Sequence, residues 1–94
     1  MATVFVPTQL RHLTGGRDRL EVPGTTVAEL IEAVETRHPG FRERVVANDE
    51  IAAGLSVAVD GDTVANGLLE RVGPTSEVHF IPALGGGLGT TRSA

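Results

Sequence analysis

Three consecutive glycines, Gly85, Gly86 and Gly87, follow the apolar run Phe80-Ile81-Pro82-Ala83-Leu84, and residues 88–94 trail behind them. Glycine has no Cβ, so such a segment can pass through a channel in which any side chain would collide. A tail of this kind suits insertion into the narrow active site of a partner. Taken alone, glycine-rich ends are more often frayed tails or linkers, so the rest of the chain must distinguish the two interpretations.

Other residue types that could carry chemistry are sparse. The chain has no cysteine, which excludes a disulfide framework, a zinc-thiolate site, an iron–sulfur cluster and a thiol nucleophile. His12, His38 and His79 lack the spacing of metal ligands, and Asp60 and Asp62 flank a turn glycine without the remaining oxygens of a calcium loop. We therefore expect no metal and no cofactor bound by this chain. No pairing of a nucleophile with a base is present, so we do not expect an enzyme acting on its own.

Length and charge narrow the class of protein further. The 94 residues suffice for one small domain with a single core. The net charge of −4, from eight arginines and twelve acids, argues against binding to nucleic acid, which requires clustered positive charge. No apolar run approaches the length of a membrane span, and the N-terminus does not resemble a signal peptide. We expect a cytoplasmic protein whose partners are proteins and which is a monomer when free.

The N-terminal part predicts a β-hairpin. Residues 2–7 alternate, with Val4 and Val6 on one face, and proline closes the run. Gly15-Gly16 marks a turn within residues 8–18, and residues 19–22 alternate again with Leu20 and Val22 toward the core.

The clearest predicted element is an amphipathic helix from Val27 to about His38. Thr26 followed by Glu29 is typical of a capping box, and apolar residues fall on one helical stripe. Pro39-Gly40 ends this helix. Residues 41–46 then predict one further turn that packs Phe41 and Val45 against the core.

The remaining pattern completes a single α+β domain. Residues 48–54 are expected to connect to a strand at 55–59, where Asp60-Gly61 indicates a hairpin. A short irregular segment precedes the last strand at 77–81. We expect a β-grasp arrangement, with a mixed four- to five-stranded sheet and one main helix on one face. The last strand can then lie beside the first and send its C-terminus directly off the sheet, which divides the chain into a domain of residues 1–84 and a tail of residues 85–94.

The sequence resembles the ubiquitin-like sulfur carriers of the MoaD/ThiS type, and among them most resembles the actinobacterial carriers used for cysteine biosynthesis. The matching motifs are short, so the resemblance is specific because of their order along the chain. Together they span Ala2 to Gly87. They are Pro7 to Arg11, Thr14-Gly15-Gly16, the helix after Val22, Val59-Asp60-Gly61, and the ending Val78 to Gly87.

That resemblance implies a protein substrate and not a catalyst. In the family, an E1-like adenylyltransferase/sulfurtransferase uses ATP to adenylate the carboxylate of the terminal glycine, and a sulfur donor displaces AMP. The resulting thiocarboxylate passes its sulfur to an acceptor synthase. The resemblance places the sulfur on Gly87, makes Gly86 and Gly85 the flexible arm, and leaves open whether the pathway makes cysteine, thiamine, molybdopterin, modified tRNA or a secondary metabolite.

The chain departs from the family pattern after its glycines. Members commonly end at the diglycine, whereas residues 88–94 follow here. The Gly87 carbonyl is therefore part of a peptide bond with Leu88, and Gly87 has no free carboxylate. We hypothesise cleavage between Gly87 and Leu88 by a protease, plausibly a JAMM-type metalloprotease. Two alternatives are an end defined by Gly89, and an extension that disables the carrier and leaves a regulatory or binding role.

A docking surface is expected on the sheet face opposite the helix. Alternation directs Phe5 and Ile81 to that face, although ordinary partial burial would explain them equally well. The predicted partner-binding residues are Phe5, Ala58, His79, Ile81, Pro82 and Leu84.

Two other functions fit the same ending. One is a ubiquitin-like modifier whose Gly87 is joined to lysines of other proteins. The other is the small subunit of a complex resembling molybdopterin synthase, in which the tail enters a larger subunit.

Overall fold

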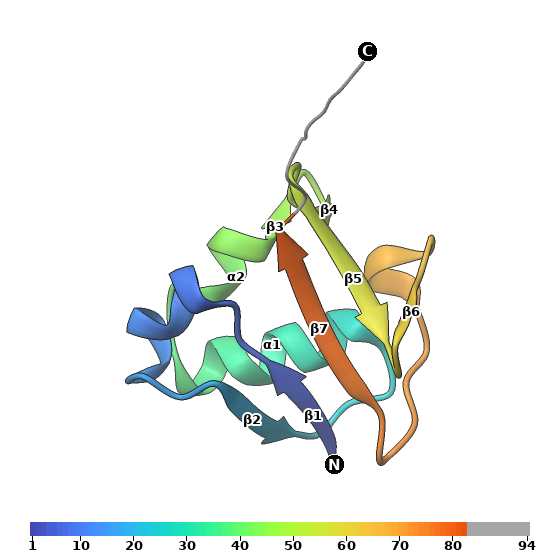
Figure 1. Ribbon diagram of the computed structural model, residues 1–94, viewed down its shortest axis with the longest axis horizontal. Coiled ribbons are helices and arrows are strands. Elements are labelled where there is room, and N and C mark those ends of the chain that lie inside the picture. Colours follow the sequence, from blue (N-terminus) through green and yellow to red (C-terminus); the bar gives the residue numbers. More distant parts are fainter. Residues whose placement is uncertain (83–94) are drawn as a thin grey trace.

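The computed structural model describes residues 1–82 and shows a mixed sheet with its main helix on one face (Figure 1). The sheet has five strands in the order β2-β1-β7-β5-β6. Their bounds are β1 Ala2–Phe5, β2 Arg19–Val22, β5 Leu55–Val59, β6 Asp62–Thr63 and β7 Glu77–Pro82. Helix α1, Val27–Arg37, lies across the back of the sheet in this view.

The last strand occupies the centre of the sheet, as the element order predicted. β7 pairs parallel with β1, where Val4 lies opposite Val78, and antiparallel with β5, where Val57 lies opposite Phe80. A parallel pair cannot be joined by a tight turn, so the whole chain between β1 and β7 forms the crossover that carries the helix. The central position fixes the direction in which β7 leaves the sheet.

One hydrophobic core fills the space between the sheet and the helices. The sheet supplies its inward-facing positions and α1 supplies the predicted stripe, and the Phe41 and Phe80 rings meet edge to face at 5.9 Å between centroids. The buried core residues are Ala2, Val4, Val6, Leu10, Leu20, Val22, Val27, Leu30, Ile31, Val34, Phe41, Val45, Val57, Val59, Val78 and Phe80.

The start of α1 is capped as the sequence indicated, with one difference. The Glu29 backbone N–H donates to the Thr26 hydroxyl oxygen at 3.2 Å, so Thr26 is the N-cap. The Glu29 carboxylate reaches past Thr26 to Thr25, accepting from its backbone N–H at 2.7 Å and from its hydroxyl at 3.0 Å. These two hydrogen bonds favour the charged form and lower the pKa of Glu29.

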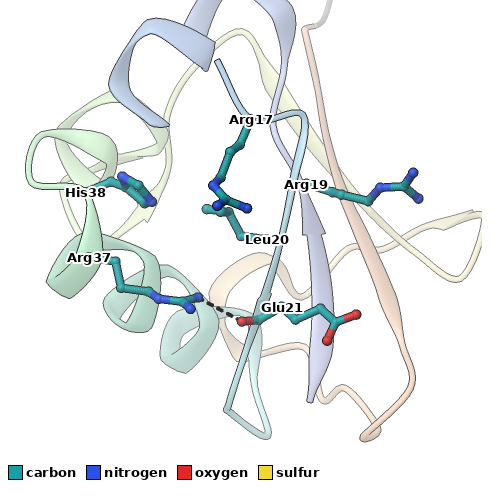
Figure 2. A pocket seen from close by; sticks show the side chains of 6 residues that line it. All are labelled: Arg17, Arg19, Leu20, Glu21, Arg37 and His38. Atoms are coloured by element: carbon teal, nitrogen blue, oxygen red, sulfur yellow. Dashed lines mark hydrogen bonds between the residues drawn. The ribbon is translucent and has the colours of Figure 1, made fainter. Parts of the chain in front are cut away.

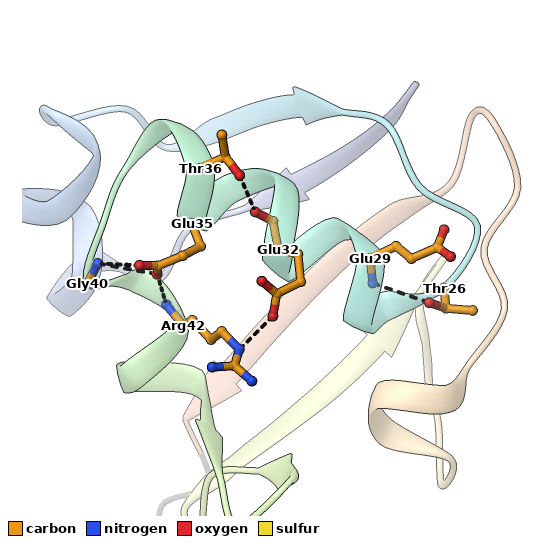
Figure 3. A network of polar contacts seen from close by, with 7 residues as sticks. All are labelled: Thr26, Glu29, Glu32, Glu35, Thr36, Gly40 and Arg42. Atoms are coloured by element: carbon orange, nitrogen blue, oxygen red, sulfur yellow. Dashed lines mark hydrogen bonds and ion pairs between the residues drawn. The ribbon is translucent and has the colours of Figure 1, made fainter.

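A second carboxylate joins α1 to helix α2, Phe41–Val45 (Figure 3). Glu35 accepts from the backbone N–H groups of Arg42 at 2.8 Å and of Gly40 at 3.1 Å. Both N–H groups lie at the start of α2, where helix geometry leaves them without intrahelical partners. Their donation lowers the pKa of Glu35. An ion pair of 2.6 Å between Arg42 Nε and Glu32 Oε2 spans the same junction.

Two segments expected to be irregular contain regular structure. Residues Thr8–Thr14 form the 3₁₀ helix η1, and the side chain of Leu10 in this helix is part of the core. Within residues 48–54, strand β4, Glu50–Ile51, pairs with β3, Val46–Ala47, around Asn48 and Asp49 at φ of 54° and 62°. Two central residues at positive φ favour a tight hairpin, which the connector prediction missed.

The segment between β6 and β7 includes a second short 3₁₀ helix, η2, Gly67–Leu69. It lies against α1, and its residue Leu68 packs against the hydrophobic core. None of the helices within residues 1–82 has the length and hydrophobicity that crossing a bilayer demands.

Candidate functional site

The three glycines follow the central strand β7 in sequence, separated from it by Ala83 and Leu84. β7 ends at Pro82, which lies opposite Leu55 of β5. The predicted arm of Gly85, Gly86 and Gly87, the predicted cleavage site between Gly87 and Leu88, and the predicted partner contact Leu84 lie outside the described residues. The described part of the site is therefore the surface around the C-terminal end of β7.

A row of side chains crosses the open face of the sheet at this end. Strand register places His79 between Phe5 of β1 and Ala58 of β5, and Arg19 of β2 opposite Phe5. The Phe5 and His79 rings are stacked, with centroids 4.1 Å apart and planes 8° apart. The Arg19 guanidinium carbon lies 5.9 Å from the Phe5 ring centroid, within the range of a cation–π contact.

Ile81 and Pro82 continue the surface toward the tail. Ile81 is 44% exposed, which is unusual for a large aliphatic side chain on a strand at the centre of a sheet, and Pro82 is half-buried. Ala58 lies on the predicted face but is only 5% exposed, because its methyl group sits low beside the larger His79. Ala58 therefore offers a partner little surface, contrary to the expectation.

A shallow hollow of about 240 Å³ lies between the row and the start of η1. The sequence prediction included only part of its lining. Pro7, Arg11 and Asp18 also contribute, and the Arg11 Nε donates to the Val6 carbonyl at 3.2 Å. Arg11 belongs to the Pro7 to Arg11 motif, so that motif was the signal that could have identified it.

The chemistry of this surface is that of recognition. Apolar groups lie at its centre and Arg11, Asp18 and Arg19 lie around them, which is the composition of a protein-binding patch. Among residues 1–82 no group of three histidines, cysteines or carboxylates lies close enough together to hold a metal ion.

Comparison with known proteins gives consistent matches over nearly the whole chain. The profile of the ThiS family matches residues 4–87. The sulfur carrier protein CysO of Mycobacterium bovis is 28% identical over 90 residues, which cover 90% of this chain and 97% of CysO.

Solved structures show the same relationship. A chain in the crystal structure of the Amycolatopsis orientalis BexX/CysO complex is 36% identical with a TM-score of 0.86, covering 93% of this chain and all of that one. The Haloferax volcanii small archaeal modifier protein 1 is 27% identical with a TM-score of 0.68, covering 92% and 98%. With its β-grasp topology and a family match that spans the domain and the glycine run, the chain belongs to the ThiS family of ubiquitin-like carrier proteins.

Proposed function

We propose that this protein is a sulfur carrier whose Gly87, once residues 88–94 are removed, receives sulfur as a thiocarboxylate. The observation that carries the proposal is that the family match ends at Gly87, the last of the three glycines. Strand β7, which precedes them, is held on both sides by neighbouring strands. A rigid strand feeding a glycine arm is suited to delivering a terminal carboxylate into a narrow site.

The proposed chemistry explains why a carrier needs a partner enzyme. A carboxylate is a poor acceptor of sulfur, so the Gly87 carboxylate first attacks the α-phosphorus of ATP to give an acyl adenylate and pyrophosphate. A sulfur nucleophile then attacks the acyl carbon, the C–O bond breaks, and AMP leaves with the bonding electrons. This chain supplies the carboxylate and a docking surface, and the E1-like partner binds the ATP.

Removal of residues 88–94 is a required first step under this proposal. In the full sequence the Gly87 carbonyl forms an amide with Leu88, and an amide has no carboxylate oxygen to attack ATP. A protease that accepts glycine on one side of the cut and leucine on the other must hydrolyse that bond. A JAMM-type metalloprotease fits this role.

The open face of the sheet is the proposed docking surface for the activating enzyme. Phe5, His79, Ile81 and Pro82 surround the strand end that leads to the tail, so an enzyme bound there is close to the glycine arm. The exposed apolar side chain of Ile81 gives such a contact a hydrophobic centre.

Intact mass spectrometry of the protein recovered from its native host tests the proposal. We expect a species that has lost residues 88–94 and in which one oxygen is replaced by sulfur. A matched reconstitution compares the full chain with a chain ending at Gly87, each with the activating enzyme and ATP. Adenylation of the full chain, or none of either chain, would contradict the proposal.

A second candidate function is favoured by one structural relative. The similarity to a small archaeal modifier protein supports a role as a ubiquitin-like modifier joined through Gly87 to lysines of other proteins. Adducts of higher mass in a lysate, cleavable between Gly87 and a lysine side chain, would favour that role over sulfur transfer.

A further inference from the structure

A basin of about 610 Å³ opens at the outer edge of the sheet, between β2 and the C-terminal end of α1 (Figure 2). It is lined by Arg17, Arg19, Leu20, Glu21, Arg37 and His38. Three of the eight arginines of an acidic chain therefore gather at one place. The basin lies along the outermost strand, whereas the proposed docking surface lies around the end of the central strand β7.

Local backbone structure fixes the position of Arg17. Gly15 and Gly16 adopt φ of 67° and 87°, conformations that glycine reaches most easily, and reverse the chain just before Arg17. The hydroxyl of buried Thr14 donates to the Arg17 carbonyl at 2.9 Å. The Thr14-Gly15-Gly16 motif, which the sulfur chemistry does not use, thus holds an arginine at the rim of the basin.

Strand β2 presents to this basin backbone groups that have no strand partner. It is the outer strand of the sheet and pairs only with β1, where Glu21 lies opposite Thr3. The Thr3 N–H donates to Ser76 on the opposite side, so the pair of Thr3 and Glu21 is not hydrogen-bonded. The N–H and C=O of Glu21 therefore point outward, and alternation gives Arg19 the same orientation.

The outward carbonyl of Glu21 already has a side-chain partner. Arg37 Nη1 donates to it at 2.9 Å, as Figure 2 shows. Within residues 1–82, Arg17 and Arg37 make no ion pair with a carboxylate, whereas Arg19 lies 4.0 Å from Asp18. The Glu21 and Arg19 side chains point to the other side of the strand in Figure 2, which leaves Arg17 and Arg37 as the charges that face the basin.

We propose that this edge binds an extended acidic segment of a partner protein, which adds to the sheet as a strand beside β2. The backbone of the segment pairs with the outward groups of Arg19 and Glu21, and its carboxylates pair with Arg17 and Arg37. Backbone groups without a strand partner select an extended peptide, and the two guanidinium groups that have no carboxylate partner within residues 1–82 select an acidic one. A nucleic acid offers no ladder of backbone N–H and C=O groups with which an edge strand could pair.

Arg37 also has a purely protective interpretation. Charged side chains commonly cover the edge strands of sheets and prevent aggregation. Protection alone predicts no affinity for an acidic strand, and it predicts self-association when Arg37 is removed. An edge that binds an acidic strand and an edge that is only protected therefore give opposite results when the protein is titrated with an acidic peptide.

The experiment titrates the full chain, labelled with ¹⁵N, with a synthetic peptide that alternates valine and glutamate. We expect saturable changes in the amide signals of Arg19 and Glu21, and none with the matched peptide in which lysine replaces glutamate. Arg17→Glu and Arg37→Glu should each weaken binding about three- to tenfold, because an attraction becomes a repulsion. Arg44→Glu makes an equal change of charge on the exposed side of α2, so it should leave the affinity unchanged.

One further variant separates strand addition from simple charge attraction. Glu21→Pro removes an outward N–H while keeping the pairing with β1, since proline is tolerated on an edge strand. It should abolish binding of the acidic peptide while the thermal unfolding transition shows a folded protein. Signal changes confined to the Phe5 and His79 surface, equal binding of the lysine peptide, or displacement of the peptide by inorganic phosphate at equal concentration would overturn the proposal. The test does not depend on sulfur transfer, because the full chain is used without an activating enzyme.

Discussion

Ile81→Ala should weaken the complex with the activating enzyme while leaving the domain folded. Full burial of an isoleucine contributes roughly 1.5–3 kcal/mol. Because 44% of Ile81 is exposed in the free protein, a partner can bury at most that share, about 0.7–1.3 kcal/mol. This corresponds to a dissociation constant raised roughly three- to ninefold.

Leu69 provides the matched control for this prediction. The side chain of Leu69 is also large, aliphatic and exposed, with an exposed fraction of 80%. It lies on η2, which contacts α1, and not on the open face of the sheet. Leu69→Ala removes a side chain of similar size whose buried share contributes at most about 0.6 kcal/mol to folding. Its effect on the complex should be negligible.

The assay measures binding of fluorescently labelled chains ending at Gly87 to the activating enzyme in the presence of a non-hydrolysable ATP analogue. Urea unfolding of each variant checks that the domain is folded under the conditions of the binding assay. Equal affinities for the parent chain and Ile81→Ala, or a larger loss for Leu69→Ala, would refute the assignment of the open face as the docking surface.

Three further predictions concern the scaffold that positions the site. Phe41→Ala should lower the free energy of unfolding by about 3–5 kcal/mol in urea titrations, because the fully buried ring packs against Phe80. Gly24→Ala should cost about 1–3 kcal/mol, since its φ is 152° and an added Cβ would lie 2.9 Å from Leu30 Cδ2. Glu35→Gln should lower the melting temperature at neutral pH, because the charged carboxylate accepts from two N–H groups at the start of α2. Its pKa is lowered in the folded state, so this stabilisation is present above the ordinary value of 4.5 and disappears as the pH falls through the folded pKa.

Each of the three has a clear contrary outcome. Phe41→Leu should retain more stability than Phe41→Ala because leucine fills part of the cavity, and equal losses would show that the volume of the cavity is not the cause. An unchanged midpoint for Gly24→Ala would mean that the turn before α1 relaxes freely. A Glu35→Gln deficit that persists well below pH 4.5 would assign the effect to shape and not to charge.

Local patterns predicted most of the elements. The α1 stripe is a helical period in which apolar side chains recur on one face, and the structure buries Val27, Leu30, Ile31 and Val34 of that stripe. Strand alternation correctly directed Val4, Val78 and Phe80 inward. Such patterns can be recognised without coordinates because neighbouring positions alone decide which face a side chain occupies.

The missed elements have a common physical cause. The β3–β4 hairpin depends on Asn48 and Asp49 at positive φ, and η1 depends on burial of Leu10 in the core. Neither segment has enough residues to display a period, so contacts with distant parts of the chain determine their conformation.

Sequence patterns were enough to predict the α+β class, the order of the main strands and of α1, the importance of the glycine ending and the family resemblance. Those features depend on local periodicity and on motifs that are contiguous in the chain. Sequence patterns could not predict that Phe5 stacks on His79, that Ala58 is covered, or that Arg17 and Arg37 line one basin beside β2. These contacts join residues far apart in sequence, and the pairing register of the strands, which sets them, follows from how the whole core packs.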